Sequence, residues 1–129
     1  MNNDDTINLS LLWESIHTDD AKFEEFAQKR LDGATKIAKN AKEKGGPAML
    51  TYHHFNVKLP HYKKAAAGKF DVDDAKKELK KLTEHLNDAV NGKVKLDQIE
   101  FQKKVGIIEV LGELLIKLDR KSTRLNSSH

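Results

Sequence analysis

Histidines gather on both sides of Pro60, at His53, His54 and His61, and this cluster is the strongest candidate for chemistry in the sequence. Imidazole is the commonest metal ligand in proteins and also titrates near neutral pH. Neighbouring residues on a helix point about 100° apart, so His53 and His54 face one ion only if the helix bends. A bend at Pro60 lets His54 and His61 converge, so a metal site built from the three histidines and added carboxylates is the less favoured interpretation of the cluster. The alternative is that one histidine packs against a neighbouring tyrosine while the others are solvated.

Two carboxylates, Glu109 and Glu113, lie four residues apart in an otherwise apolar segment. One helix face would present both, which suits either a metal shell or general acid–base catalysis in a cleft. The same residues also align with Gln102 and Lys117 as one polar stripe. The pattern favours a solvated stripe with an ordinary ion pair between Glu113 and Lys117.

Most other chemistries lack the residues that they need. The chain contains no cysteine, which excludes a disulfide framework, a thiolate zinc site and an iron–sulfur cluster. Glu14 and His17 have the spacing of di-iron ligands in helical bundles, but such a site needs a second copy of the pair, which the sequence lacks. Gly45-Gly46-Pro47 does not have the order of a phosphate-binding loop. We therefore expect no cofactor and favour a protein that is not an enzyme.

Four lysines, Lys76, Lys77, Lys80 and Lys81, project from neighbouring strips of one predicted helix. Such a face can contact nucleic-acid phosphates without reading their sequence, and the contact would weaken steeply with salt. Acidic residues share the helix, and Arg30 is the only arginine before residue 119. Base readout relies on arginine, so this interpretation is limited to non-specific binding.

Helices must position all of these residues, because apolar side chains recur at three- and four-residue spacing along most of the chain. No segment shows the alternation of a strand. The predicted helices are Ile7–Ile16, Asp20–Lys44, Ala48–Lys58, Pro60–Ala67, a helix capped by Asp71 and ended by Asn91-Gly92, and Leu96–Leu118.

The boundaries between these helices follow from residue type. Thr18 and Asp19 have the side chains of a helix N-cap, which separates the first two helices. Gly45-Gly46-Pro47 ends the second helix. Pro60 disfavours the helical conformation at Leu59, which predicts a kink or break there.

Leu96–Leu118 is apolar over well over half of its circumference, which is typical of a helix that other helices surround. Gly106 and Gly112 would allow neighbouring backbones to approach closely. A chain of 129 residues, 38% hydrophobic and 33% charged, supports one modest core. The prediction is an all-α fold: a compact single-domain bundle of five or six helices over residues 1–118, with its apolar C-terminal helix at the centre.

The last eleven residues, Asp119 to His129, match an in-frame translation of a common short-read sequencing adapter at every codon. We therefore expect this segment not to be native and the native chain to be truncated near Leu118. Its three basic residues and one acidic residue also account for part of the basic character. The formal net charge is +3 for the whole chain and +1 without the segment, so the charge says little about nucleic acid.

By elimination, the sequence predicts a small helical interaction or regulatory protein that acts through a surface. Its partner would be another protein or a second copy of the same chain. Non-specific nucleic-acid binding and a His/Glu metal site are the two alternatives. The polar, acidic N-terminus predicts a cytoplasmic protein without an export signal, and no segment predicts a membrane span.

Overall fold

The protein is all-α over the part of the chain that the structure describes. The computed structural model describes the backbone of residues 3–127 and the side chains of residues 20–118, and this part contains no strand. The fold class predicted from the sequence is therefore confirmed. The helices are α1 (Asn3–Lys44), α2 (Ala48–Asn56), α3 (Leu59–Ala66), α4 (Val72–Val90) and α5 (Gln98–Ser127).

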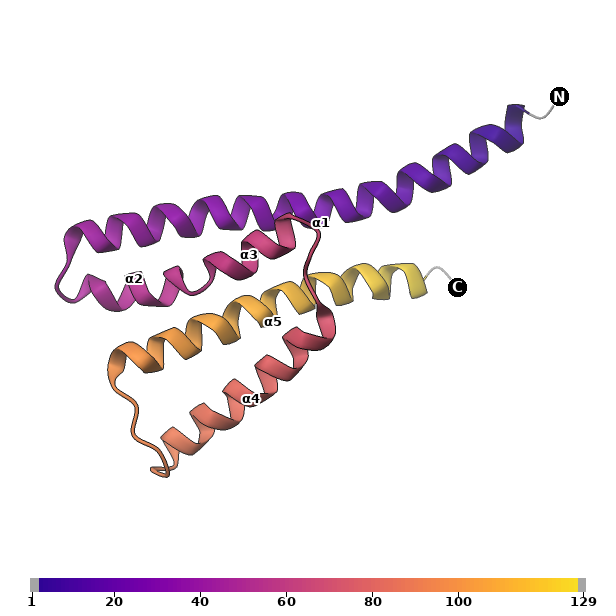
Figure 1. Cartoon of the computed structure of the whole chain (residues 1–129). Helices are drawn as coiled ribbons and strands as arrows, with labels where there is room; N and C mark the ends of the chain where they lie inside the picture. The colour runs from indigo at the N-terminus through magenta and orange to yellow at the C-terminus, as the bar shows by residue number, and fades with distance from the viewer. Residues whose placement is uncertain (1–2, 128–129) are drawn as a thin grey trace.

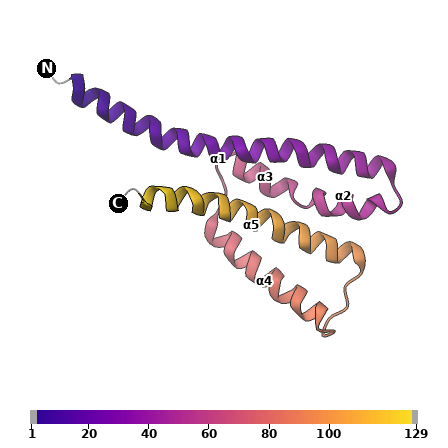
Figure 2. The same cartoon turned by 180° about the vertical axis from the view of Figure 1, so that it is seen from behind.

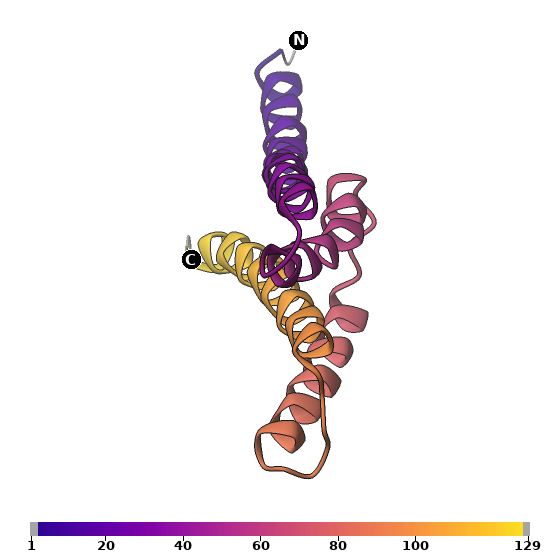
Figure 3. The same ribbon diagram turned by 90° about the vertical axis from the view of Figure 1, so that its left-hand side faces the viewer.

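The helices form a row in the order α1, then α2 and α3, then α5 and finally α4 (Figure 1). Helix α1 packs along α2 and α3, which follow each other in a single pass. Helix α5 packs against α2 on one side and α4 on the other, and it also touches α1 and α3. Figure 2 shows the same order from behind. In Figure 3, the axes of α4 and α5 run in a different direction from the axis of α1. Because α2 and α3 together make one pass, the described residues make four helical passes, and the predicted bundle of five or six separate helices is corrected.

Helix α1 is continuous, and the break predicted at Thr18 and Asp19 is wrong. Neither glycine nor proline lies near Thr18 and Asp19, and adding residues to an existing helix is much easier than starting a new one. The predicted end is confirmed, because Gly45 and Gly46 have φ angles of +65° and +57°. These left-handed conformations suit glycine and turn the chain back along α1.

The break between α2 and α3 falls slightly earlier than the sequence predicts, at Val57 and Lys58 instead of Leu59. Pro60 has no N–H, so it cannot donate the hydrogen bond that would continue the helix to the carbonyl of Asn56. The backbone makes a tighter turn here than in an α-helix, because the N–H of Lys58 donates to the carbonyl of Phe55, three residues earlier, at 3.1 Å. The break changes the helix direction and lets α2 and α3 follow α1 as one pass.

Capping residues set the starts of α4 and α5. The carboxylate of Asp71 accepts a hydrogen bond from the N–H of Asp74 at 3.0 Å, which confirms the predicted N-cap of α4. The carboxylate of Asp97 accepts from the N–H of Glu100 at 2.7 Å in the same way. Helix α5 therefore begins after Asp97, a little later than the predicted start at Leu96.

The core is built largely from small side chains. Its buried apolar residues are Ala27, Ala34, Ala38, Ala41, Tyr62, Ala65, Ala75, Leu82, Val110, Leu111 and Leu114. The alanines of α1 let α2 and α3 approach closely, and the larger residues belong mainly to α5. Gly106 supports one close approach, since a Cβ atom there would lie 2.2 Å from the carbonyl oxygen of His54.

Helix α5 is central but not fully surrounded. Ile99 and Ile116 are exposed, and Gly112 has no atom within 4 Å of the position of a Cβ atom. The prediction that Gly112 supports close packing within the fold is therefore wrong, as is the prediction that the whole apolar arc of this helix is covered. Part of this arc faces outward because α4 and the α2–α3 pass cover only two sides of the helix.

Candidate functional site

The His54 ring lies between α2 and α5, where both of its nitrogens have partners. Its Nε2 lies 3.1 Å from Oε2 of Glu109, and its Nδ1 lies 3.1 Å from Oε1 of Gln102. Both partner atoms are side-chain oxygens of residues on α5. Only 14% of the His54 side chain is exposed. His54 therefore connects two helices as a largely buried polar contact.

The three histidines proposed as metal ligands do not come together. The rings of His53 and Tyr52 are arranged edge to face, with their centroids 5.1 Å apart. His61 lines a separate hollow beside the start of α4. Within residues 20–118, no group of three histidine, aspartate or glutamate side chains is placed to hold a metal ion. The described side chains therefore provide no ligand set for the metal site considered from the sequence.

Lys58 is a buried cation at the break between α2 and α3. Its side chain is 10% exposed, and its Nζ lies 3.4 Å from Oε1 of Glu109. The same nitrogen lies 4.8 Å from the centroid of the Phe55 ring. Burial of a charge is costly unless partners replace water, and here the carboxylate and the aromatic face do so. Glu109 therefore holds both Lys58 and His54 against α5.

Glu113 connects α5 to α1 and α3 in the same way. The hydroxyl of the buried Tyr62 donates to Oε1 of Glu113 at 2.5 Å. The guanidinium of Arg30 forms an ion pair with the other oxygen. Lys117 does not take the place predicted for it beside Glu113; its Nζ lies 4.7 Å from the Phe26 ring centroid. The prediction of a solvated stripe is therefore only partly correct: Glu109 is half exposed, but both carboxylates also contact side chains from other helices. We call these contacts of Glu109 and Glu113 the polar network; together they join α1, α2 and α3 to α5.

The ionisation states in this network favour structure over catalysis. Burial, followed by the hydrogen bond to Glu113, raises the pKa of Tyr62. Burial disfavours the charged form of Glu113, but hydrogen bonds from Arg30 and Tyr62 outweigh it, so the pKa of Glu113 is lowered. A phenol that keeps its proton and a carboxylate that stays ionised are poorly matched to proton transfer near neutral pH.

The lowered pKa of Glu113 predicts a loss of stability in acid. A carboxylate with a lowered folded-state pKa stabilises the fold above its unfolded-state pKa, and this contribution disappears as the pH falls through the folded-state value. Glu113→Gln is expected to lower the free energy of unfolding by about 1 kcal/mol at neutral pH, because Arg30 is half exposed and its ion pair is screened.

Chemical denaturation between about pH 6 and pH 3 measures this effect. The wild type should lose more stability than Glu113→Gln as the pH falls. Glu25→Gln is the control, since Glu25 forms an exposed ion pair with Lys29 at 3.2 Å. Equal pH dependence in the wild type and in Glu113→Gln would contradict the assignment of this carboxylate.

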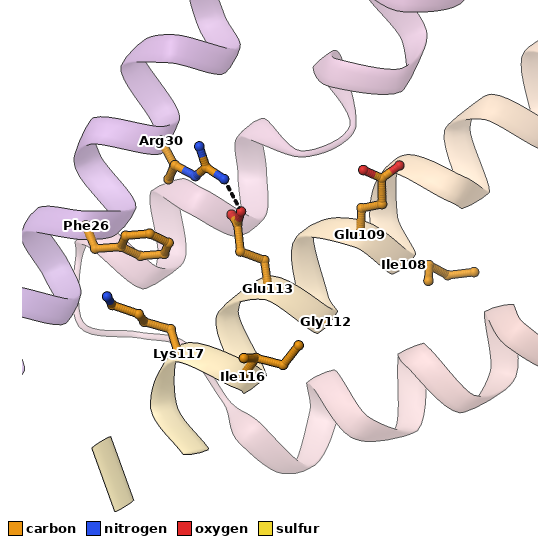
Figure 4. Close-up of a pocket in the computed structure, with 8 residues that line it drawn as sticks. All are labelled: Phe26, Arg30, Ile108, Glu109, Gly112, Glu113, Ile116 and Lys117. Atoms are coloured by element: carbon orange, nitrogen blue, oxygen red, sulfur yellow. Dashed lines mark hydrogen bonds and ion pairs between the residues drawn. The ribbon is translucent and has the colours of Figure 1, made fainter. Parts of the chain in front are cut away.

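A groove of about 520 Å³ lies beside this network, between α1 and α5 (Figure 4). Its lining residues are Phe26, Arg30, Ile108, Glu109, Gly112, Glu113, Ile116 and Lys117. Ile108 and Ile116 project to the same side of α5, while Glu113 points to Arg30. Ile116 is 56% exposed. The groove thus has apolar walls and a rim with two charges of each sign.

Of the residues that line this groove, Glu109 and Glu113 were singled out from the sequence as a carboxylate pair, with Lys117 in the same polar stripe. The remaining walls, formed by Phe26, Arg30 and two isoleucines, were not predicted to belong to a site. Their only sequence signals are the four-residue spacing of Phe26 and Arg30 and the two isoleucines that flank Gly112 at equal distances. Both signals also fit a fully covered core face. Only the placement of α4 and α1 shows that the face is open.

The four lysines of the nucleic-acid hypothesis, Lys76, Lys77, Lys80 and Lys81, are all exposed on α4. Acidic side chains of the same helix are exposed among them, so the face is mixed in charge. Phosphate binding by these lysines stays a prediction.

The side chains of Glu14 and His17 lie outside the described side chains. Over the described part of the chain, no helix contains a stretch long and apolar enough to cross a membrane. Comparison of the sequence with protein-family models and curated proteins, and of the fold with solved structures, found no match, so the site is interpreted from its own geometry.

Proposed function

We propose that this protein is a helical interaction module that binds an amphipathic helix of a partner protein in the groove between α1 and α5. The observation that carries the proposal is the uncovered apolar face of α5. Ile116 is 56% exposed, and with Ile108 and Phe26 it gives the groove apolar walls. Recognition of a helix in a groove uses such a surface, with apolar residues of the ligand at three- and four-residue spacing.

The polar network supports this proposal because it fixes the groove walls. Glu113 contacts Arg30 of α1 and Tyr62 of α3, and Glu109 contacts Lys58. These contacts set the spacing of α1 and α5 before any ligand arrives. A preformed groove avoids part of the entropy cost of binding.

The charges of the rim favour a partner of mixed charge. Arg30 and Lys117 provide positive charge, and Glu109 and Glu113 provide negative charge. A strongly acidic or basic ligand would meet repulsion as well as attraction. An amphipathic helix that carries both signs along its polar edges matches the rim, so electrostatics contributes specificity.

A displayed library of amphipathic helices tests the proposal on the full-length chain. Selected helices should bind the wild type and lose about tenfold or more in affinity with Ile116→Glu, since about 1.4 kcal/mol corresponds to a factor of ten. Val90→Glu is the matched control, because Val90 is an exposed apolar residue on α4, away from the groove. Failure to select any helix, or equal binding to both variants, would overturn the proposal.

A further inference from the structure

A second hollow, of about 420 Å³, lies between α1, the α2–α3 pass and α5. It shares Arg30, Glu109 and Glu113 with the groove and continues past them to Phe55 and Lys58. Small-molecule sites in proteins have a similar size and combine apolar walls with a few convergent polar groups. The side chains of the hollow therefore indicate which class of ligand would fit.

Two polar residues of this lining are almost completely buried, since Tyr62 is 4% exposed and Lys58 is 8% exposed. The Nζ atom of Lys58 lies between Glu109 and the Phe55 ring, which also line the hollow. Its distance of 3.4 Å to Oε1 of Glu109 is longer than the roughly 2.7–2.9 Å of a close charge-assisted hydrogen bond. An ammonium group has three N–H donors, and in the described part of the chain Glu109 gives this one its one acceptor. Lys58 can therefore donate to a further oxygen.

The carboxylates of the lining, in contrast, already have partners. Oε2 of Glu109 lies 3.1 Å from Nε2 of His54, and the two oxygens of Glu113 contact Arg30 and Tyr62. Burial raises the pKa of Tyr62, so its hydroxyl keeps its proton and adds no negative charge. The lining thus offers more donors than acceptors, and a matching ligand would supply acceptor oxygens.

Two cations of the lining, Arg30 and Lys58, converge near Glu113. Hydrogen bonds from Arg30 and Tyr62 outweigh burial and lower the pKa of Glu113, and the positive charge of Lys58 adds to this effect. Arg30 donates to Glu113 from one nitrogen and has further N–H groups in its planar guanidinium. A carboxylate has two oxygens, so one ligand group could accept from both cations.

The other walls of the hollow are apolar. Ala34 and Ile37 of α1 and Phe55 of α2 line it. Gly33 leaves open space, since nothing lies within 4 Å of the position of a Cβ atom there. Ile37 is 42% exposed, so the hollow opens to solvent beside it. An apolar ligand body would gain free energy by leaving water for these walls, whereas a bare inorganic anion would not.

We propose that this hollow binds a small organic carboxylate, with its charged group against Lys58 and Arg30 and a compact apolar body against Ala34, Ile37 and Phe55. A single negative charge suits the site, because two carboxylates lie in the same lining and would repel a higher charge. The proposal does not depend on helix binding in the neighbouring groove.

Chemical-shift titration of the full-length chain tests the proposal. The probes are phenylacetate and isovalerate, each compared with its neutral amide, and inorganic phosphate. At least one of the carboxylates should give saturable shifts at the backbone amides of Gly33, Ala34 and Ile37, and its amide and phosphate should bind severalfold more weakly. Equal binding of the carboxylate and its amide, equal binding of phosphate, or no saturable shift with any probe would overturn the proposal.

Lys58→Met removes the buried cation and keeps a long apolar side chain. It should weaken carboxylate binding about tenfold or more, because a hydrogen bond to a charged group is lost. Lys80→Met on the exposed face of α4 makes the same charge change away from the hollow and should bind like the wild type. Circular dichroism verifies that each variant is folded. Unchanged binding by a folded Lys58→Met would contradict the assigned role of this cation.

Ile37→Glu provides a second test that leaves the buried cation in place. The exposed position tolerates a polar side chain, and the new negative charge beside the hollow should weaken carboxylate binding severalfold with little effect on amide binding. Val90→Glu makes the same substitution type on the exposed part of α4. An equal loss in both variants, or no loss with Ile37→Glu, would overturn the proposal.

Discussion

Leu114→Ala is expected to lower the free energy of unfolding by about 2–5 kcal/mol. Leu114 is fully buried where α5 meets the other helices. Truncation removes its transfer free energy and leaves a cavity that the surrounding helices fill only in part. Small domains are stable by about 5–15 kcal/mol in total. The loss is therefore large for a core whose other buried side chains are mostly alanines, and it should be visible as a lower melting temperature.

Val90→Ala is the matched control for this experiment. Val90 is an apolar residue near the end of α4 and is 74% exposed. Its truncation removes little buried surface, so the free energy of unfolding should change by less than about 0.5 kcal/mol. A similar loss of stability in both variants would contradict the assigned core.

Gly106→Ala is expected to destabilise the fold by about 1–3 kcal/mol, although alanine is the better helix former. The new Cβ atom would lie 2.2 Å from the carbonyl oxygen of His54 and 2.7 Å from Cγ2 of Val57. The first contact is with backbone, which cannot rotate away. Helices α2 and α5 must therefore separate, and the contacts of His54 with Gln102 and Glu109 lengthen with them.

Gly33→Ala is the control with the opposite expected sign. Gly33 lies inside α1, and nothing lies within 4 Å of the position of a Cβ atom there. Alanine should raise the free energy of unfolding by up to about 1 kcal/mol, because it restricts the unfolded chain more than glycine does. Urea denaturation of both variants measures the difference. Stabilisation by Gly106→Ala would show that α2 and α5 are not in close contact.

The local parts of the fold could be predicted because they depend on neighbouring residues. Gly45 and Gly46 end α1, and Asp71 caps α4, as their residue types indicate. The predicted break at Thr18 and Asp19 was wrong for the opposite reason. Cap residues permit a helix start but do not enforce one when the flanking turns can remain helical.

The site was harder to predict because it depends on which helices meet. Glu113 and Lys117 have the spacing of a pair within one helix, but Arg30 and Tyr62 are closer partners in the folded chain. Those partners lie far away in the sequence, and no local pattern links them. The open side of α5 is likewise a consequence of the helix order, which periodicity alone does not determine.

The alanine face of α1 has a thermodynamic consequence. Ala27, Ala34, Ala38 and Ala41 are buried, but each removes little apolar surface from water. The heat-capacity change of unfolding and the denaturant m-value both grow with the apolar and total surface that unfolding exposes. Burial of this alanine face should therefore add little to either quantity. The stability curve of this protein should be flatter with temperature than that of a leucine-rich bundle of equal length.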